Sequence, residues 1–157
     1  MKVKLIQIGK TDASYLAEGI EHYNRRIKRY HTYDVLTIPD IKNSKKLTQE
    51  QQKEQEGLLL LKNIQNPDFV ILLDEKGIEL NSVQFSLFIE KTMLQSVKQL
   101  VFIIGGPYGF SKAMYERANK KIALSRMTFS HQLVRLIFAE QLYRANSIIK
   151  KEPYHHE

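Results

Sequence analysis

The sequence predicts an α/β fold in which helices cover both faces of a mostly parallel sheet. Short apolar segments alternate with longer amphipathic segments along the chain, an order typical of α/β proteins. Residues 69–73 are apolar at every position, which indicates a strand buried on both faces, as in parallel sheets. The chain has 157 residues, enough for one sizeable core, and we expect a single domain spanning residues 1–157.

A strand, a helix and a second strand are predicted at the start of the chain. Residues 3–8 alternate apolar and polar side chains, and Gly9 ends the pattern. Residues 12–30 carry the apolar stripe of an amphipathic helix, whose tyrosines we expect to pack in the core. The stripe consists of Leu16, Ile20, Tyr23, Ile27 and Tyr30. Residues 35–38 predict the second strand.

The middle of the chain predicts a capped helix followed by the buried strand. Within the polar stretch 39–57, Thr48 and Gln51 have the spacing of a capping box, so we expect a helix to begin there and continue to Ile64. Residues 69–73 then form the strand, and residues 74–77 form a turn.

The last part of the chain predicts three helices and two strands. A helical face at residues 85–97 precedes a strand at 100–104, and a short helix at 111–120 precedes a short strand at 122–124. A long helix follows at residues 130–150 and is apolar almost all round. It therefore has two faces to bury, which makes a subunit interface a reasonable hypothesis.

Composition excludes several classes of chemistry and favours one class of partner. The absence of cysteine excludes disulfides, thiolate metal sites and a thiol nucleophile. No apolar run approaches the roughly 20 residues of a membrane span, and no signal-peptide pattern is present, so we expect a cytoplasmic protein. The formal charge of +7 favours an anionic partner such as nucleic acid; a basic protein without one is the alternative. The basic clusters comprise Arg25, Arg26, Lys28, Arg29, Lys42, Lys45 and Lys46.

Two loops that follow predicted strands are candidate ligand sites. The first, residues 105–109, contains three glycines, which allow positive φ and close approach to a ligand. The second is formed by residues 124–129. In a parallel sheet these loops and Leu73 meet at one edge, where α/β proteins bind ligands. Neither loop has the spacing of a dinucleotide or phosphate-binding motif, and ordinary chain turns are the alternative.

Titratable side chains gather on the long helix and in the tail. His131 and Arg135, like Glu140 and Arg144, are four residues apart, so each pair is expected to share a helix face. The tail histidines could accept a proton near neutral pH, although terminal histidines are more often solvated. No set of His, Asp and Glu has the spacing of a metal site, and we expect no metal.

Several segments together resemble one known family. They are residues 104–109, 125–129, 131–135, 140–145 and 153–155. Through them, and nearly end to end, the chain resembles the ribosomal RNA large subunit methyltransferase H family of SPOUT methyltransferases. The resemblance implies transfer of a methyl group from S-adenosylmethionine to N3 of a pseudouridine in 23S rRNA. It also implies a C-terminal trefoil knot and a homodimer in which neither protomer alone makes a complete site. Because a single domain offers little surface for RNA, we expect the assembled ribosome to present the target.

The resemblance further implies roles for particular residues. The cofactor-binding residues that it implies are Leu73, Gly105, Leu124, Ser125, Arg126, Met127, Thr128 and Phe129. Tyr154 and His155 match the family's tail motif and are candidates to assist loss of the N3 proton, with Arg144 positioning the RNA or the uracil.

Two other classes of protein fit parts of this pattern. A nucleotide-binding enzyme of flavodoxin-like shape could use the same glycine loop, and its cofactor preference would distinguish it. A non-catalytic ribosomal RNA binder or assembly factor would bind RNA without affinity for S-adenosylmethionine.

Overall fold

The computed structural model describes residues 1–156 and contains one sheet of five strands, in which every pairing between strands is parallel. The strands are β1 (Lys2–Ile8), β2 (Thr32–Ile38), β3 (Phe69–Glu79), β4 (Gln99–Ile104) and β5 (Lys120–Ala123). Their order across the sheet is β2-β1-β4-β3-β5. The carboxyl ends of all five strands therefore lie at one edge.

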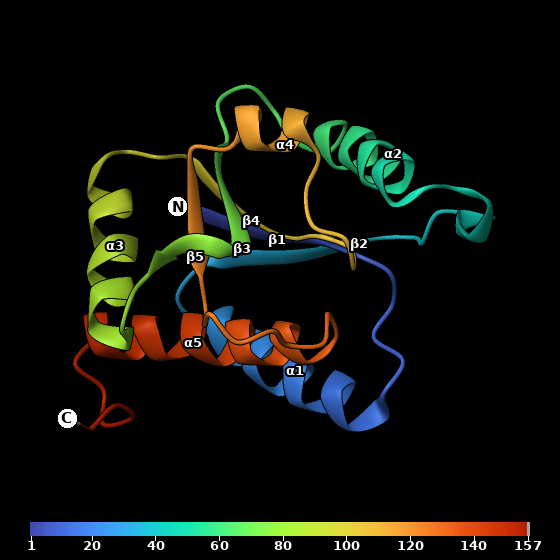
Figure 1. Cartoon of the computed structure of the whole chain (residues 1–157). Coiled ribbons are helices and arrows are strands. Elements are labelled where there is room, and N and C mark those ends of the chain that lie inside the picture. Colours follow the sequence, from blue (N-terminus) through green and yellow to red (C-terminus); the bar gives the residue numbers. More distant parts are fainter. Residues whose placement is uncertain (157) are drawn as a thin grey trace.

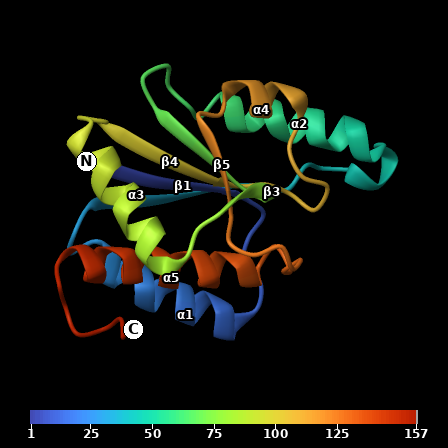
Figure 2. The ribbon, with the colours of Figure 1, turned by 60° about the vertical axis from the view of Figure 1, so that its left-hand side comes forward.

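Helices cover both faces of this sheet, which confirms the predicted fold class. The helices are α1 (Ser14–Ile27), α2 (Gln49–Leu61), α3 (Ser82–Leu94), α4 (Lys112–Arg117) and α5 (Leu133–Ile149). Figure 1 shows α1 and α5 below the sheet, α2 and α4 above it, and α3 at the left, reaching down to α5, with which it shares one core cluster. The turned view in Figure 2 shows the same two layers.

The central strand β4 explains how one apolar run serves two cores. Leu100, Phe102 and Ile104 pack into the cluster under α5, while Val101 and Ile103 pack into the cluster under α2 and α4. The period-two alternation of a strand divides them in this way. Burial on both faces is the reason that residues 100–104 of this strand are all apolar.

Local capping sets several helix starts as the sequence predicts. Thr48 and Gln51 form both bonds of the expected capping box at the start of α2. The Ser111 hydroxyl accepts a hydrogen bond from the Met114 amide at 3.4 Å and caps α4. The helix predicted at residues 111–120 ends early, at Arg117, because Asn119 binds the Val70 amide at 2.7 Å and brings the chain back to the sheet.

Two longer helices are also shorter than their sequence patterns. The helix predicted over residues 12–30 extends three residues past Ile27, where α1 ends. The helix predicted from residue 130 begins three residues later, at Leu133. Tyr30 continues the apolar periodicity past the end of α1 because its ring lies 6.2 Å from that of Tyr143 on α5, so periodicity places helix ends poorly.

The predicted turn at residues 74–77 is instead an irregular part of β3. Ile122 of β5 is in register with both Leu73 and Ile78, so β3 continues past the irregularity to Glu79. Gly77 allows this close approach, since a Cβ there would lie 2.6 Å from the Ile122 amide nitrogen. The trefoil knot implied by the family resemblance stays a prediction.

The apolar surface of α5 has an explanation within one chain. α5 packs on the sheet and also contacts α1 on one side and α3 on the other. Apart from Leu133, which is 37% exposed, the apolar residues of α5 are buried or partly buried in the monomer, and the predicted subunit interface needs other support. Over residues 1–156, no helix is long and apolar enough to cross a membrane.

Candidate active site

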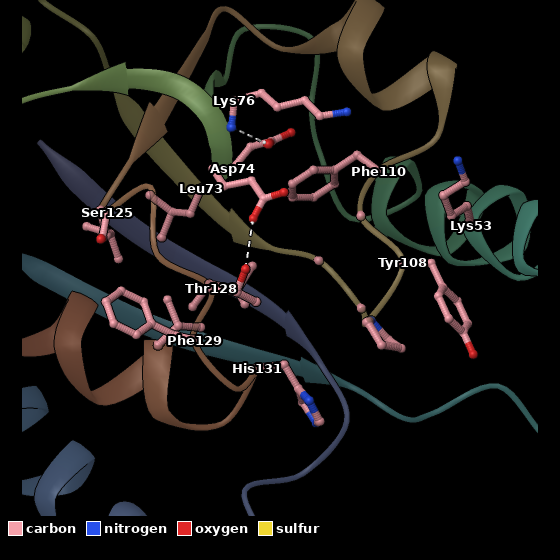
Figure 3. Close-up of a pocket in the computed structure, with 18 of the residues that line it drawn as sticks. Lys53, Leu73, Asp74, Lys76, Tyr108, Phe110, Ser125, Thr128, Phe129 and His131 are labelled. Atoms are coloured by element: carbon pink, nitrogen blue, oxygen red, sulfur yellow. Dashed lines mark hydrogen bonds between the residues drawn. The ribbon is translucent and has the colours of Figure 1, made fainter.

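The site begins with a cavity at the carboxyl ends of β3, β4 and β5. Its volume is about 450 Å³, within the roughly 300–1,000 Å³ typical of small-molecule sites. It is lined by Leu73, the last residue of β3 before its irregularity, by Ile104 at the end of β4 and the residues 105–110 that follow it, and by residues 124–129 except Arg126. Figure 3 shows Ser125, Thr128 and Phe129 on one side and Tyr108 on the other. The three strand ends meet here because the strands are parallel.

The glycines of the first loop serve different purposes. Gly109 alone has a positive φ, at 85°, which a side chain would strain. A Cβ on Gly105 would lie 3.0 Å from the Phe110 ring, and a Cβ on Gly106 would lie 2.6 Å from the Glu56 carboxylate. Gly105 and Gly106 thus leave room for neighbouring side chains. The sequence had suggested that all three glycines serve the conformation of the loop backbone.

Two hydrogen bonds made by side chains hold the second loop in place beside the cavity. The Ser125 hydroxyl accepts from the Met127 amide at 3.0 Å, and the Thr128 hydroxyl donates to Glu75 at 3.4 Å. Arg126 turns away from the cavity and pairs with Glu79 at 2.8 Å in an exposed ion pair. Its guanidinium group is therefore not placed to contact a molecule in the cavity.

Residues that the sequence did not single out also line the cavity. They include Lys53, Asp74, Glu75, Lys76 and Tyr115. Asp74 accepts from the Lys76 amide at 2.8 Å and from the Tyr115 hydroxyl at 2.5 Å. Burial and this carboxylate raise the pKa of Tyr115, so its phenol stays protonated. The sequence did offer one sign of this role for Asp74, because it directly follows the apolar run 69–73.

A second cluster of functional groups lies where the tail folds back on α5. Glu140 accepts from Nε of Arg144 at 3.0 Å and from Nη2 at 2.5 Å. Its Oε1 also accepts from the Tyr154 hydroxyl at 3.0 Å, and Nη1 of Arg144 lies 3.3 Å from Nδ1 of His155. The three residues suggested as catalytic are thus brought together, and we call them with Glu140 the tail cluster.

Electrostatics fix the protonation of this cluster. The bonds to Glu140 raise the pKa of Arg144, which keeps its charge. Burial, with hydrogen bonds to Tyr23 and Glu140, raises the pKa of Tyr154, so this phenol is a donor at neutral pH. The Arg144 guanidinium also lies 4.7 Å from the centre of the Tyr154 ring, in a cation–π contact.

Tyrosines of the N-terminal helix region anchor the tail. The hydroxyls of Tyr23 and Tyr154 are 3.2 Å apart, and the Tyr30 hydroxyl donates to Glu152 at 2.5 Å. Tyr23 also packs against the core, as expected, but its hydroxyl contact across 131 residues could not be read from periodicity. The tail is therefore ordered by tertiary contacts.

The tail cluster lies further along α5 than the cavity, near the middle of the helix, and none of its residues lines the cavity. Val134, in the first turn, lines the cavity, and Arg144 lies ten residues further along the helix. At about 1.5 Å per residue, this separates them by about 15 Å along the axis. A single chain therefore does not place the tail cluster against the cavity.

The buried side chain of Arg135 links α5 to the end of β1 and does not face the cavity. It is 1% exposed, and its guanidinium donates to the Thr11 hydroxyl at 2.9 Å and to the Ile8 carbonyl at 2.5 Å. Burial lowers its pKa, and the charges of Asp40 and Asp12 oppose this shift. His131 is exposed and precedes α5, so the prediction that His131 and Arg135 share a helix face is wrong.

The fold and the cavity define a class: α/β enzymes that bind a small molecule at the carboxyl ends of parallel strands. The family model described as "Predicted SPOUT methyltransferase" matches residues 1–155. The Ribosomal RNA large subunit methyltransferase H of Parabacteroides distasonis is 57% identical, with 100% of both chains covered. The protein of that name from Christiangramia forsetii is 53% identical, with 99% of both covered. This chain belongs to the ribosomal RNA large subunit methyltransferase H family of SPOUT methyltransferases.

One solved structure gives a more distant likeness. The SpoU methyltransferase AviRb from Streptomyces viridochromogenes, in complex with AdoMet, aligns with a TM-score of 0.48 and 8% identity. The alignment covers 92% of this chain and 58% of that one. This likeness is too distant to bear on the site.

Proposed function

We propose that this protein transfers a methyl group from S-adenosylmethionine to N3 of a pseudouridine in large-subunit ribosomal RNA, on the assembled ribosome. The observation that carries the proposal is the cavity at which three strand-end loops converge, in a chain of the methyltransferase H family. The names of the relatives support ribosomal RNA as the substrate.

The cavity lining suits the adenosine part of this cofactor. Leu73, Leu124 and Phe129 provide apolar surface for a flat base. The backbone of residues 105–109 and 124–129 provides donors and acceptors for the polar edge of the base and the ribose. Ser125, Met127 and Thr128 belong to the same wall, whereas Arg126 does not line the cavity and its side chain pairs with Glu79.

The chemistry is an in-line displacement at the methyl carbon. N3 forms the new bond to carbon while the carbon–sulfur bond breaks, and S-adenosylhomocysteine leaves with the electron pair. Holding nitrogen, carbon and sulfur in line supplies most of the acceleration. N3 must also lose its proton, so groups that stabilise negative charge on the uracil ring promote the reaction.

The tail cluster is suited to that stabilisation. Tyr154 is kept protonated, and Arg144 carries a positive charge. Because Nδ1 of His155 faces Nη1 of Arg144, which can only donate, the neutral imidazole carries its proton on Nε2. In this arrangement His155 donates a hydrogen bond, for example to a uracil carbonyl, and a base role requires release from Arg144.

A homodimer would unite the two halves of the site. Within one chain no residue of the tail cluster lines the cavity, and Arg144 lies about 15 Å from Val134 along α5. A second copy with its α5 running in the opposite direction would bring its tail cluster to the first copy's cavity. Two-fold pairing of this kind creates two equal composite sites.

The basic residues suit a ribosomal substrate. Arg26 stacks on Tyr143, 5.2 Å from the ring centre, beside the tail cluster, and Lys28 and Arg29 follow after α1. Such groups would orient the RNA through its phosphates without reading its sequence.

The test is incubation of the protein with labelled S-adenosylmethionine and ribosomes from cells that lack the endogenous activity. We expect label at N3 of a single pseudouridine in the large-subunit RNA. Cofactor binding with label elsewhere would refute the substrate assignment. Absence of cofactor binding, with ribosome binding retained, would identify a non-catalytic RNA binder instead.

A further inference from the structure

A buried carboxyl group beneath the glycine loop is not used by the site described above. Glu56 of α2 is 3% exposed, and its Oε1 accepts a hydrogen bond from the side-chain amide of Gln52 at 3.0 Å. Its Oε2 has no hydrogen-bond partner within residues 1–156. A buried polar atom left unpaired costs roughly 1–3 kcal/mol, so its retention calls for a reason.

The carboxyl group lies directly against the cavity loop. A Cβ on Gly106 would be 2.6 Å from Oε1 of Glu56 and closer still to Oε2. A Cβ on the next residue of α2, Gly57, would lie 3.0 Å from Cβ of Ser111, which caps α4 just after the loop. Two consecutive residues of α2 therefore support the loop near both of its ends.

The charges around Glu56 favour its neutral form. Burial raises the pKa of Glu56, and the nearby Asp40 carboxylate raises it further, while the bond from Gln52 opposes these effects. Tyr108, the titratable side chain within the loop, is 44% exposed. On α4, Lys112 and Glu116 are exposed and pair with each other. A neutral carboxyl group can both donate and accept, as a glutamine side chain does.

We propose that Glu56 is a positioning residue for the cofactor. Its carboxyl group holds the backbone of Gly106, so that the loop 105–109 keeps the shape that binds S-adenosylmethionine. Its free Oε2 is the hydrogen-bonding atom available to the loop backbone when the cofactor is bound. Glu56 acts through the loop and touches no reacting atom. This inference rests on the proposed function.

A double-mutant cycle on cofactor affinity tests the contact. The dissociation constant for S-adenosylmethionine is measured by calorimetry for the wild type, E56A, G106A and E56A/G106A, with the melting temperature of each. We expect E56A and G106A each to weaken binding about tenfold, which is about 1.4 kcal/mol. We expect the double variant to bind no more weakly than E56A, because removal of the carboxyl group makes room for the new methyl group.

Two further variants separate positioning from folding. E56Q, which keeps the shape and both hydrogen-bonding functions, is expected to bind within about threefold of wild type. E54A removes an exposed carboxylate two residues away on the same helix and is expected to bind as wild type does. If E56A does not fold, E56S replaces it in the cycle.

The outcomes are distinct. Wild-type affinity in E56A, or independent effects that multiply in the double variant, would overturn the inference while leaving the proposed function intact. A wild-type protein that does not bind S-adenosylmethionine at all would overturn the proposed function, and this inference with it.

Discussion

Glu140 gives the sharpest test of the tail cluster, because one of its oxygens accepts three hydrogen bonds. Nε and Nη2 of Arg144 lie 3.0 Å and 2.5 Å from Oε1, and the Tyr154 hydroxyl lies 3.0 Å from it. The substitution E140Q keeps the shape and the acceptor but removes the negative charge. It therefore weakens the contacts that dock Tyr154 and orient Arg144.

The magnitude follows from the type of bond. Hydrogen bonds to a charged group contribute about 1.5–3 kcal/mol and neutral ones about 0.5–1.5 kcal/mol, so three bonds lose about 3 kcal/mol when fully buried. The side chains of Arg144 and Glu140 are 25% and 20% exposed, which reduces this to about 2 kcal/mol. If catalysis needs the docked tail, turnover falls about 30-fold.

The assay is single-turnover methylation of ribosomes, together with calorimetric binding of S-adenosylmethionine. We expect E140Q to lower the methylation rate and to change cofactor affinity by less than about threefold, because three strand-end loops form the cavity. E21Q is the matched control, since Glu21 forms an exposed ion pair with Arg25. Normal turnover in E140Q would refute the role of the tail cluster, and an equal loss of cofactor affinity would refute its separation from the cavity.

Three other variants probe the cavity, the tail anchor and the buried carboxyl group. F129A should weaken S-adenosylmethionine binding at least tenfold, whereas R126A should leave calorimetric affinity within about twofold because its guanidinium pairs outside the cavity. Y23F removes a hydroxyl that contacts Tyr154 and should lower turnover about fivefold at unchanged cofactor affinity; unchanged turnover would contradict the anchor. The raised pKa of Glu56 means that its neutral form is favoured on folding, so stability falls as pH rises through that pKa. E56Q should therefore melt above wild type at pH 8 and lose that advantage near pH 4; an advantage independent of pH would refute this assignment.

The fold class and the meeting of the strand-end loops could be predicted because both follow from short-range patterns. A fully apolar run such as residues 69–73 indicates a strand covered on both faces, and parallel strands bring their carboxyl ends to one edge. The capping box at Thr48 follows from four neighbouring residues. These features need no knowledge of distant contacts.

The contents of the site were less predictable. Glu56 is a glutamate on a largely polar helix, and nothing in its spacing marks it as buried against Gly106. Arg135 reads as a surface cation but is buried on the Ile8 carbonyl. The apolar surface of α5 suggested a second subunit, whereas α1 and α3 cover two of its sides. In each case the partner lies far away in the sequence.

The sequence by itself determined the alternation of strands and helices, the parallel sheet and the position of the cavity at its carboxyl edge. These depend on hydrophobic periodicity and turn chemistry, which act over a few residues. Only the tertiary structure decided that the tail returns to Tyr23 and Glu140, and that the tail cluster does not line the cavity. Contacts across more than a hundred residues depend on how helices pack over the sheet, and local patterns carry no information about that packing.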